Sequence, residues 1–406
     1  MKKFIFPIAF LLLALNLFSQ LGQNEVTAMN ITVPVRVLDG SRFVDNVTIE
    51  DFELYEDGTL QKIDALYLVQ KTKIERKETP KEFNPNLSRN FYLLFQLTDW
   101  DPKLGEAIEY FFNNVFLPED SLIIVTPQQY YNLSPEAFRN NTKEDSIKEM
   151  KKILRRDIKV GNSHYNSILR DLRRLVREIQ SAAGLGRSTD TSVESGFQDQ
   201  TMSLELLLPR YQLALQKMDE LRFIDEKKFT SFAGVLKKQL NQKYVFLFYQ
   251  REFRPEIDPT IVSKMMVLFQ DKPHILGELS DLFNTYSRQI TFNKDRLKQT
   301  FADSSLLFNF LFSNKNPKEI SGVYMREQSE DVFSAFSEVA EATGGIVDNS
   351  QNLLFGFKKA AEISESYYLL YYSPKNYVKD GKFKSIKIKV KNKDYEINYR
   401  QGYFAR

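Results

Sequence analysis

A continuous apolar run at Phe91–Phe95 is the clearest strand signal in the chain. Such a run is typical of a strand that is covered on both faces, as in a parallel α/β sheet. A helix should follow it, because Asp101 can cap a helix and Pro102 suits a first turn. The apolar positions expected on one face of this helix are Leu104, Ala107, Ile108, Phe111, Phe112, Val115 and Phe116. Another strand-like run at Ser121–Thr126 completes a strand, helix and strand unit.

Both ends of the mature chain show strict alternation instead. Ile31, Val33, Val35 and Val37 alternate with Thr32, Pro34 and Arg36, which predicts an antiparallel strand with one buried face. Pro34 cannot donate a ladder hydrogen bond, so the strand should lie at a sheet edge there. Near the other end, Ile386–Val390 alternates in the same way. Neither group has enough strands to be stable alone, so we expect them to pair into one small β-sandwich.

These patterns predict an α/β fold with a doubly wound, mostly parallel sheet inserted between the terminal β-strand groups. Further buried strands are expected at Tyr244–Tyr249 and Leu306–Phe312, and Gly344-Gly345 should stop a helix. The predicted organisation is a signal peptide at 1–22, an N-terminal β segment at 27–72, a charged linker at 73–88, an α/β domain at 89–363 with a flexible insertion at 184–203, and a C-terminal β segment at 364–406 that pairs with 27–72.

Composition narrows the possible functions. A chain of 406 residues that is 42% hydrophobic and 13% aromatic can bury substantial cores, and its length favours two domains. The formal charge is only +3, from 56 basic and 53 acidic residues, so nothing in the charge favours a nucleic-acid partner. The chain has no cysteine, which excludes disulfides and a lipid anchor on cysteine.

The amino terminus has the pattern of an export signal. Lys2 and Lys3 precede an apolar run at Phe4–Leu17, which Ser19 and Gln20 follow. We therefore expect an exported protein, periplasmic or extracellular, with cleavage near residues 19–23. An uncleaved membrane anchor is the alternative, and it would be the chain's one contact with a membrane.

Three stretches of the chain carry recognisable motifs: Val33–Ile63 with its EDFELYEDG segment, Ala335–Pro374 with its YYLL strand, and Asp380–Ala405 with its GYFA ending. Together they resemble a bacterial family of exported proteins built on a von Willebrand factor type A-related domain, of the type abundant in acidobacteria. The first stretch is similar to the leader of that family, the second to its closing helix, strand, helix and strand, and the third to its final hairpin. The resemblance implies a Rossmann-like A domain and a role in protein binding or assembly.

Active A domains of this kind bind Mg²⁺ at a metal-ion-dependent adhesion site of acidic and hydroxyl side chains. Aligned by resemblance, the positions of that site fall at Gln96, Thr98, Trp100, Ser163 and Gln250. Two carboxylates are thus neutral amides, and one hydroxyl is an indole without an acceptor. Mg²⁺ needs oxygen ligands that usually include a carboxylate. We therefore expect a degenerate site that holds no metal and no cofactor.

The acidic residues beside these positions leave one alternative open. Asp99 and Asp101 lie in the same loop, and a shifted register could recruit them to a metal. Trp100, the one tryptophan, also has two interpretations: it could anchor a partner from this loop, or it could fold down to fill the vacated ion site. The candidate interaction residues are Gln96, Thr98, Asp99, Trp100, Ser163 and Gln250.

Signals for enzymatic chemistry are weak. Cysteine nucleophiles are absent, and imidazole chemistry has only His164 and His274. No glycine-rich phosphate loop and no HExxH motif is present. The expected function is therefore that of an exported, non-enzymatic protein that mediates protein–protein interaction or assembly at the cell envelope. The alternatives are a structural envelope scaffold and, further, a metal-dependent adhesion protein or an unrecognised hydrolase.

Overall fold

The computed structural model describes most of the chain. Its described residues are 29–78, 83–136, 142–185, 197–221, 226–286, 293–317, 319, 323–375, 377–391 and 394–406. The expected signal peptide at 1–22 lies outside them, as do residues 186–196 of the expected insertion. The last part of that insertion, from Phe197, belongs to a helix.

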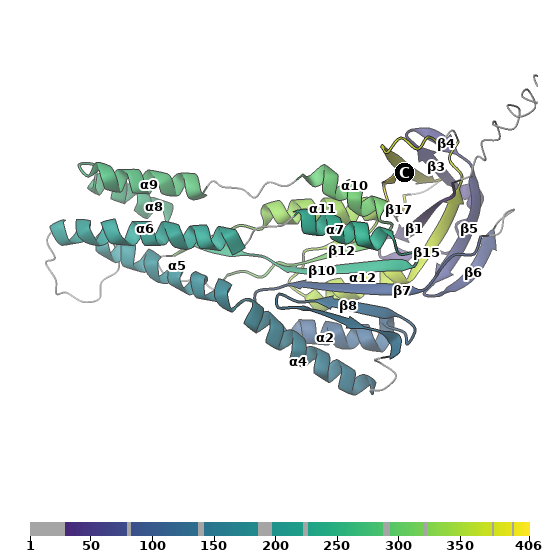
Figure 1. The fold of residues 1–406 in the computed structure, drawn as a ribbon, viewed down its shortest axis with the longest axis horizontal. Helices are drawn as coiled ribbons and strands as arrows, with labels where there is room; N and C mark the ends of the chain where they lie inside the picture. Colours follow the sequence, from purple (N-terminus) through teal and green to yellow (C-terminus); the bar gives the residue numbers. More distant parts are fainter. Residues whose placement is uncertain are drawn as a thin grey trace, which may run out of the picture.

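A six-stranded mixed sheet forms the centre of the molecule (Figure 1). Its order is β14-β12-β10-β7-β8-β9, with parallel pairing throughout except for the antiparallel edge strand β9. The strands are β7 (Arg89–Gln96), β8 (Ser121–Val125), β9 (Tyr130–Leu133), β10 (Gln242–Gln250), β12 (Leu307–Ser313) and β14 (Val347–Asp348).

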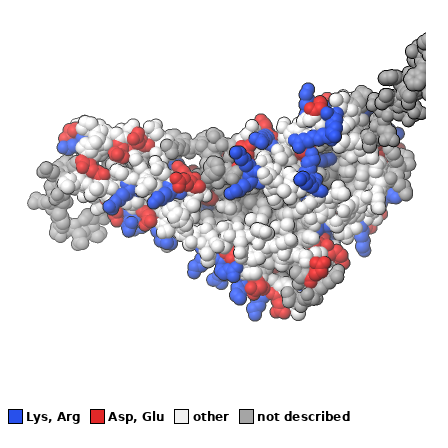
Figure 2. Space-filling model, viewed as in Figure 1, with Lys and Arg blue, Asp and Glu red and all other residues white. Residues whose placement is uncertain are grey.

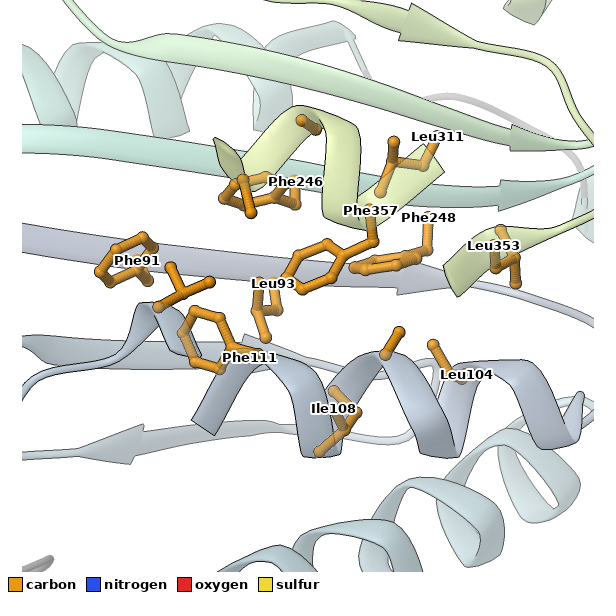
Figure 3. Packing of buried hydrophobic residues seen from close by; sticks show 14 of the residues in the cluster. Phe91, Leu93, Leu104, Ile108, Phe111, Phe246, Phe248, Leu311, Leu353 and Phe357 are labelled. Atoms are coloured by element: carbon orange, nitrogen blue, oxygen red, sulfur yellow. The ribbon is translucent and has the colours of Figure 1, made fainter. Parts of the chain in front are cut away.

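Helices cover both faces of this sheet. On one face lie α2 (Pro102–Tyr110) with the π-helical turn η2 (Phe111–Val115), α4 (Lys143–Gly161) and α12 (Leu353–Glu365). On the other lie α7 (Glu226–Lys237), α10 (Lys294–Asp303) and α11 (Glu330–Thr343). Figure 3 shows the first of these cores, where Phe357 of α12 lies against Phe246 and Phe248 of β10.

Local signals explain the start and the end of these helices. Asp101 caps α2 by accepting a hydrogen bond from the backbone nitrogen of Lys103, as predicted. α11 ends at Gly344, whose φ of +77° is the left-handed conformation expected of a helix stop. A side chain at Gly344 or at Gly345 would also collide with the backbone. A Cβ on Gly344 would lie 2.7 Å from the backbone nitrogen of Tyr399, and one on Gly345 would lie 1.9 Å from the carbonyl oxygen of Phe308. The pair therefore both stops the helix and lets it approach the sheet.

A helical arm projects from the sheet (Figure 1). It consists of α5 (Ser163–Ala182), α6 (Phe197–Leu221), α8 (Pro259–Leu268) and α9 (Pro273–Tyr286), and the antiparallel pair β11 (Phe253–Glu256) and β13 (Tyr324–Glu327) joins it to the sheet. The arm buries its own core, which includes Leu172, Leu208 and Leu279. Since β10 leads directly into β11, the arm extends from the carboxyl ends of the central strands.

The terminal segments form a curled half-barrel at the opposite end (Figure 1). One sheet has the order β17-β1-β15-β5-β6, with β2 paired to β1, and a four-stranded sheet has the order β18-β16-β3-β4. The strands are β1 (Ile31–Asp39), β2 (Arg42–Phe43), β3 (Phe52–Glu56), β4 (Thr59–Gln61), β5 (Ile63–Gln70), β6 (Lys73–Glu78), β15 (Ser366–Tyr372), β16 (Phe383–Val390), β17 (Glu396–Tyr399) and β18 (Gly402–Phe404), with a short 3-10 turn, η1, at Ile49–Asp51.

Two details of the terminal strands differ from expectation. Strand β6 lies within the expected linker and pairs with β5 along an edge of its sheet. β1 is an inner strand, but its pairing with β17 covers only Val35–Leu38, so Pro34 lies beyond that contact. Moreover, Arg36, expected on an exposed face of β1, is only 3% exposed because that face meets the central sheet.

The expected fold class, a doubly wound and mostly parallel sheet with a small terminal β-sandwich, is therefore wrong. Among the described strands, ten pairings are antiparallel and four are parallel. The protein is a mixed α/β structure with a mixed central sheet and a curled half-barrel. The physical reason is that long helices of the arm pack on one another instead of on the sheet, while the chain ends contribute many antiparallel strands.

None of the described helices combines the length and the apolar character that a membrane span requires.

Candidate functional site

The strand ends that face the arm bring most of the predicted site residues together. β7 ends at Gln96 and β10 ends at Gln250, and the two strands are neighbours with Tyr249 opposite Gln96. Gln250 is only 8% exposed, and its side-chain oxygen accepts hydrogen bonds from the backbone nitrogens of Thr98 (3.2 Å) and Asp99 (3.1 Å). Gln250 therefore fixes the loop that follows β7.

Trp100 does not project from this loop. It is partly buried and packs against the core of the central sheet. A Cβ placed on Gly105 of α2 would lie 3.3 Å from its ring atom Cζ2, so the indole rests on the first turns of that helix. The sequence offered a partner anchor or a side chain folded down into the vacated ion site; in the structure Trp100 is folded down, and its ring lies against α2.

Asn162, rather than Ser163, connects the loop to the arm. Ser163 is the exposed first residue of α5, whereas Asn162 before it is buried. The Asn162 amide nitrogen donates to the carbonyl oxygens of Leu97 (2.7 Å) and Ile158 (2.8 Å). Sequence reasoning missed Asn162 because nothing in its local pattern distinguishes it from the neighbouring serine.

Asp99 and Asp101 have separate roles in the structure. Asp99 is exposed, and its charge acts on Arg173 of α5, whose pKa is nevertheless lowered, chiefly by burial. Asp101 is engaged as the cap of α2. Within the described part of the chain, no group of three or more His, Asp or Glu side chains is arranged to hold a metal ion.

A cavity of about 390 Å³ opens beside this loop. Its lining is mainly apolar and comes from β7, β8, β10, α6, α7 and α11. It includes Leu94, Gln96, Val125, Leu221, Phe229 and Phe336. Polar groups lie among them, including Lys228 and Glu252. This is the size and the composition of pockets that hold an organic group. This cavity could not be predicted from the sequence, because its walls come from segments far apart in the chain.

A buried polar network stabilises the neighbouring strand end. The Asp157 carboxylate of α4, only 1% exposed, accepts hydrogen bonds from the Thr126 hydroxyl (3.1 Å), the Tyr131 hydroxyl (2.5 Å) and Arg156 Nε (2.9 Å). Thr126 and Tyr131 thereby connect the β8–β9 hairpin to α4, and the network holds one wall of the site in place.

The two histidines lie on the arm. His164 lines a groove between α5 and α6 together with charged side chains of both signs, and His274 is hydrogen-bonded to Glu205 (2.5 Å). Figure 2 shows acidic and basic side chains interspersed along the arm, with neither sign dominant on that face.

Comparisons with known proteins give little to set beside this geometry. No family model matches the chain, and no curated protein matches it. Among solved structures, the crystal structure of the human COPII-coat protein Sec24c is similar at 8% sequence identity and a TM-score of 0.30, over 79% of this chain and 44% of that one. This chain thus spans less than half of that structure, and a likeness at this level supports no conclusion about fold or function. The resemblance to the von Willebrand factor type A-related family stays a prediction.

Proposed function

We propose that this protein is a non-enzymatic binding protein that contacts a partner protein at the carboxyl ends of β7, β8 and β10. The observation behind this proposal is the apolar cavity of about 390 Å³ beside the loop that follows β7. An apolar or aromatic side chain of a partner would fill it, and a few buried anchors of this kind provide most of the affinity of an interface. Gln96 lines the cavity, and Asp99 lies in the adjacent loop. Both side chains are exposed and would contact the partner's backbone or polar groups.

Contact without a metal is part of the proposal. The side-chain oxygen of Gln250 already accepts two backbone hydrogen bonds, and Gln96 offers a neutral amide where a carboxylate would be needed. Preorganisation of the loop by Gln250 lowers the entropy lost on binding, which favours direct recognition of a protein.

The test uses two matched leucines. Leu221 lines the cavity and is 44% exposed, while Leu240 is 86% exposed and lies outside the lining. A photo-crosslinking residue at position 96 first captures the partner from the producing cells, and the affinity of the purified pair is then measured. We expect Leu221→Asp to weaken binding at least about tenfold, because it places a charge in an apolar contact. Leu240→Asp should bind as the unaltered protein does, and equal affinity of the two variants would contradict the proposal.

A small apolar ligand is the second candidate, because the cavity volume falls within the range of small-molecule pockets. Native mass spectrometry of the purified protein distinguishes the two. A bound small molecule that Leu221→Asp releases and Leu240→Asp retains would favour the ligand over the protein partner.

We also propose that the protein acts outside the cytoplasm, at the cell envelope. The support is the basic start and the apolar run of residues 2–17. Cell fractionation with and without residues 1–22 tests it: the full chain should be found outside the cytoplasm, and the truncated chain inside. A purely structural scaffold would keep its place in an envelope assembly when Leu221 is replaced, whereas a binding protein would lose its partner.

A further inference from the structure

A small cavity lies where the half-barrel meets the amino ends of the central strands. Its volume is about 20 Å³, enough for a particle of about the size of one water molecule. The wall consists of Pro34 and Arg36 of β1, residues 242–244 at the start of β10, residues 305–307 before and in β12, Thr343 and Arg400.

Three cationic side chains line this cavity, and all three are buried. Arg36 is 3% exposed, Lys243 5% and Arg400 7%. They come from three separate elements, since Arg36 lies in β1, Lys243 in β10 and Arg400 directly after β17. The fold therefore places three positive charges in the wall of this joint, where water has little access. The charge of Arg400 acts on Lys243. Arg36 instead acts on Tyr244 and lies over the ring of Tyr367.

The hydrogen-bond partners of these cations are neutral. Arg36 Nε donates to the carbonyl oxygen of Ile363 (3.0 Å), and Arg400 Nη2 donates to that of Thr32 (2.6 Å). Lys243 Nζ donates to the carbonyl oxygen of Leu236 in α7 (3.1 Å) and to that of Gln239, just after α7 (3.0 Å). The Nε atom of Arg400 is buried and has no hydrogen-bond partner.

The carboxylate that acts on this joint is already engaged elsewhere. Of the ion pairs formed within the described ranges, none includes Arg36, Lys243 or Arg400. Asp303 acts electrostatically on Arg400. However, its oxygens already accept hydrogen bonds from Lys237 Nζ (2.8 and 2.7 Å) and from the backbone nitrogen of Phe404 (2.9 Å).

Like charges buried together without a counter-charge are costly. Burial lowers the pKa of Arg36 and of Arg400, and burial and then the charge of Arg400 lower the pKa of Lys243 to about 8. An anion in the cavity would offset the repulsion and would accept hydrogen bonds from the unused donors.

We propose that this cavity binds one small monovalent inorganic anion, with chloride as the ion of fitting size and charge, and that the ion stabilises the joint between the half-barrel and the central sheet. Phosphate or sulfate would not fit a space for about one water molecule. The recognition elements are the buried Nε of Arg400 and the positive charges of Arg400 and Lys243, which act on one another.

Ser305 allows a matched test. It lines the cavity, is half-buried and has a φ of +49°, a left-handed conformation that Asp and Asn tolerate better than other side chains. Ser305→Asp would supply an internal carboxylate in place of the ion, whereas Ser305→Asn has the same shape without the charge. The Tm of the purified protein and of each variant is measured against chloride concentration, with gluconate keeping the ionic strength constant.

We expect a saturable rise of Tm with chloride for the unaltered protein and for Ser305→Asn. Ser305→Asp should lose this chloride-dependent shift. In crystals grown with bromide, an anomalous-scattering peak should lie beside Lys243 and Arg400. The absence of both the saturable shift and the bromide peak would overturn the proposal, and so would a full chloride response in Ser305→Asp. If Ser305→Asp does not fold, Arg400→Gln replaces it and should show the same loss.

Discussion

Two clusters of buried charges, one at each end of the central sheet, differ in the groups that stabilise their cations. At the base of the arm, Arg254 donates through Nε (3.0 Å) and Nη2 (2.6 Å) to one oxygen of the Glu256 carboxylate, and Arg326 Nε donates to the other (2.7 Å). Glu256 has no exposed surface, and Arg254 is 1% exposed. At the joint with the half-barrel, three buried cations have backbone carbonyls as their hydrogen-bond partners.

The arm cluster has counter-charges for its buried cations within the protein, whereas the cations at the joint form no ion pair among the described residues. The arm cluster is further enclosed by Tyr286, whose ring lies 5.4 Å from the Arg254 guanidinium and 5.8 Å from that of Arg326. Tyr211 and Tyr286 share a hydrogen bond of 2.8 Å beside it. Buried charges in this cluster are thus matched by carboxylates within the protein. At the joint they are not, so stability there should depend on ions and on pH.

The largest expected effect comes from breaking the arm cluster. Glu256→Gln keeps the shape of the side chain but leaves Arg254 buried with only Asp219, at 3.4 Å, as a negatively charged partner. Removing one member of a buried pair costs about 3–5 kcal/mol, and we expect a loss of this size in the free energy of unfolding measured with urea. Glu178→Gln on α5 is the control, because Glu178 pairs with Arg174 at the surface and should cost less than about 1 kcal/mol. Equal losses in the two variants would contradict the assignment.

The joint should respond to pH in a way that the arm cluster does not. Lys243 has a pKa lowered from 10.5 to about 8 by burial and by Arg400, so the unfolded chain binds more protons than the folded protein between pH 8 and 10.5. Stability therefore rises with pH through this interval, and the penalty of the buried charge is fully present below pH 8. In chloride-free buffer we expect a gain of about 2 kcal/mol between pH 8 and 9.5.

Lys243→Met supplies the control for this pH dependence. It removes the titrating group, so the gain should disappear. Saturating chloride should also reduce the gain in the unaltered protein, because a bound anion favours the charged lysine. A gain of the same size in Lys243→Met would mean that another group is responsible.

A neutral polar contact offers a smaller effect for comparison with the two charged clusters. Gln250→Ala removes the acceptor for the backbone nitrogens of Thr98 and Asp99. Since those groups lie in a loop that water can reach, the expected cost is about 1 kcal/mol in urea unfolding. Amide hydrogen exchange at Thr98 and Asp99 should accelerate. Gln128→Ala, an exposed glutamine in the β8–β9 turn, should change neither quantity.

The parts of this structure that depend on local signals were predictable from the sequence. The apolar run of β7, the Asp101 cap of α2 and the glycine stop of α11 each act within a few residues of the chain. β6 was missed because its sequence, KIERKE, has no apolar periodicity; its charges instead suit the edge strand that it forms. The packing of four helices into a separate arm could not be predicted, because an apolar stripe does not say which surface will cover it.

The candidate site was predictable only in part for the same reason. The family resemblance placed Gln96 and Gln250 in one site, and the structure places them at the ends of neighbouring strands. The burial of Arg36 was not foreseen, because alternation in β1 marks two faces without showing that both are covered. The cavity beside Gln96 and the cation cluster at the joint arise from residues hundreds of positions apart, and only the assembled structure brings them together.

The smallest expected effect is at the loop itself, where charge is scarce. Titration of the protein with Mg²⁺ or Mn²⁺ should give no saturable heat at millimolar concentration, because Gln96 and Gln250 are neutral and the Gln250 oxygen is engaged. Asp101 is likewise engaged as a helix cap, which leaves Asp99 as the exposed carboxylate of the loop. A variant with Gln96→Asp and Gln250→Asp adds two carboxylates at adjacent strand ends. If only this variant binds the ion, the missing carboxylates explain why the unaltered loop does not bind it. Saturable binding to the unaltered protein would instead show that Asp99 is sufficient and that the proposed metal-free contact is wrong.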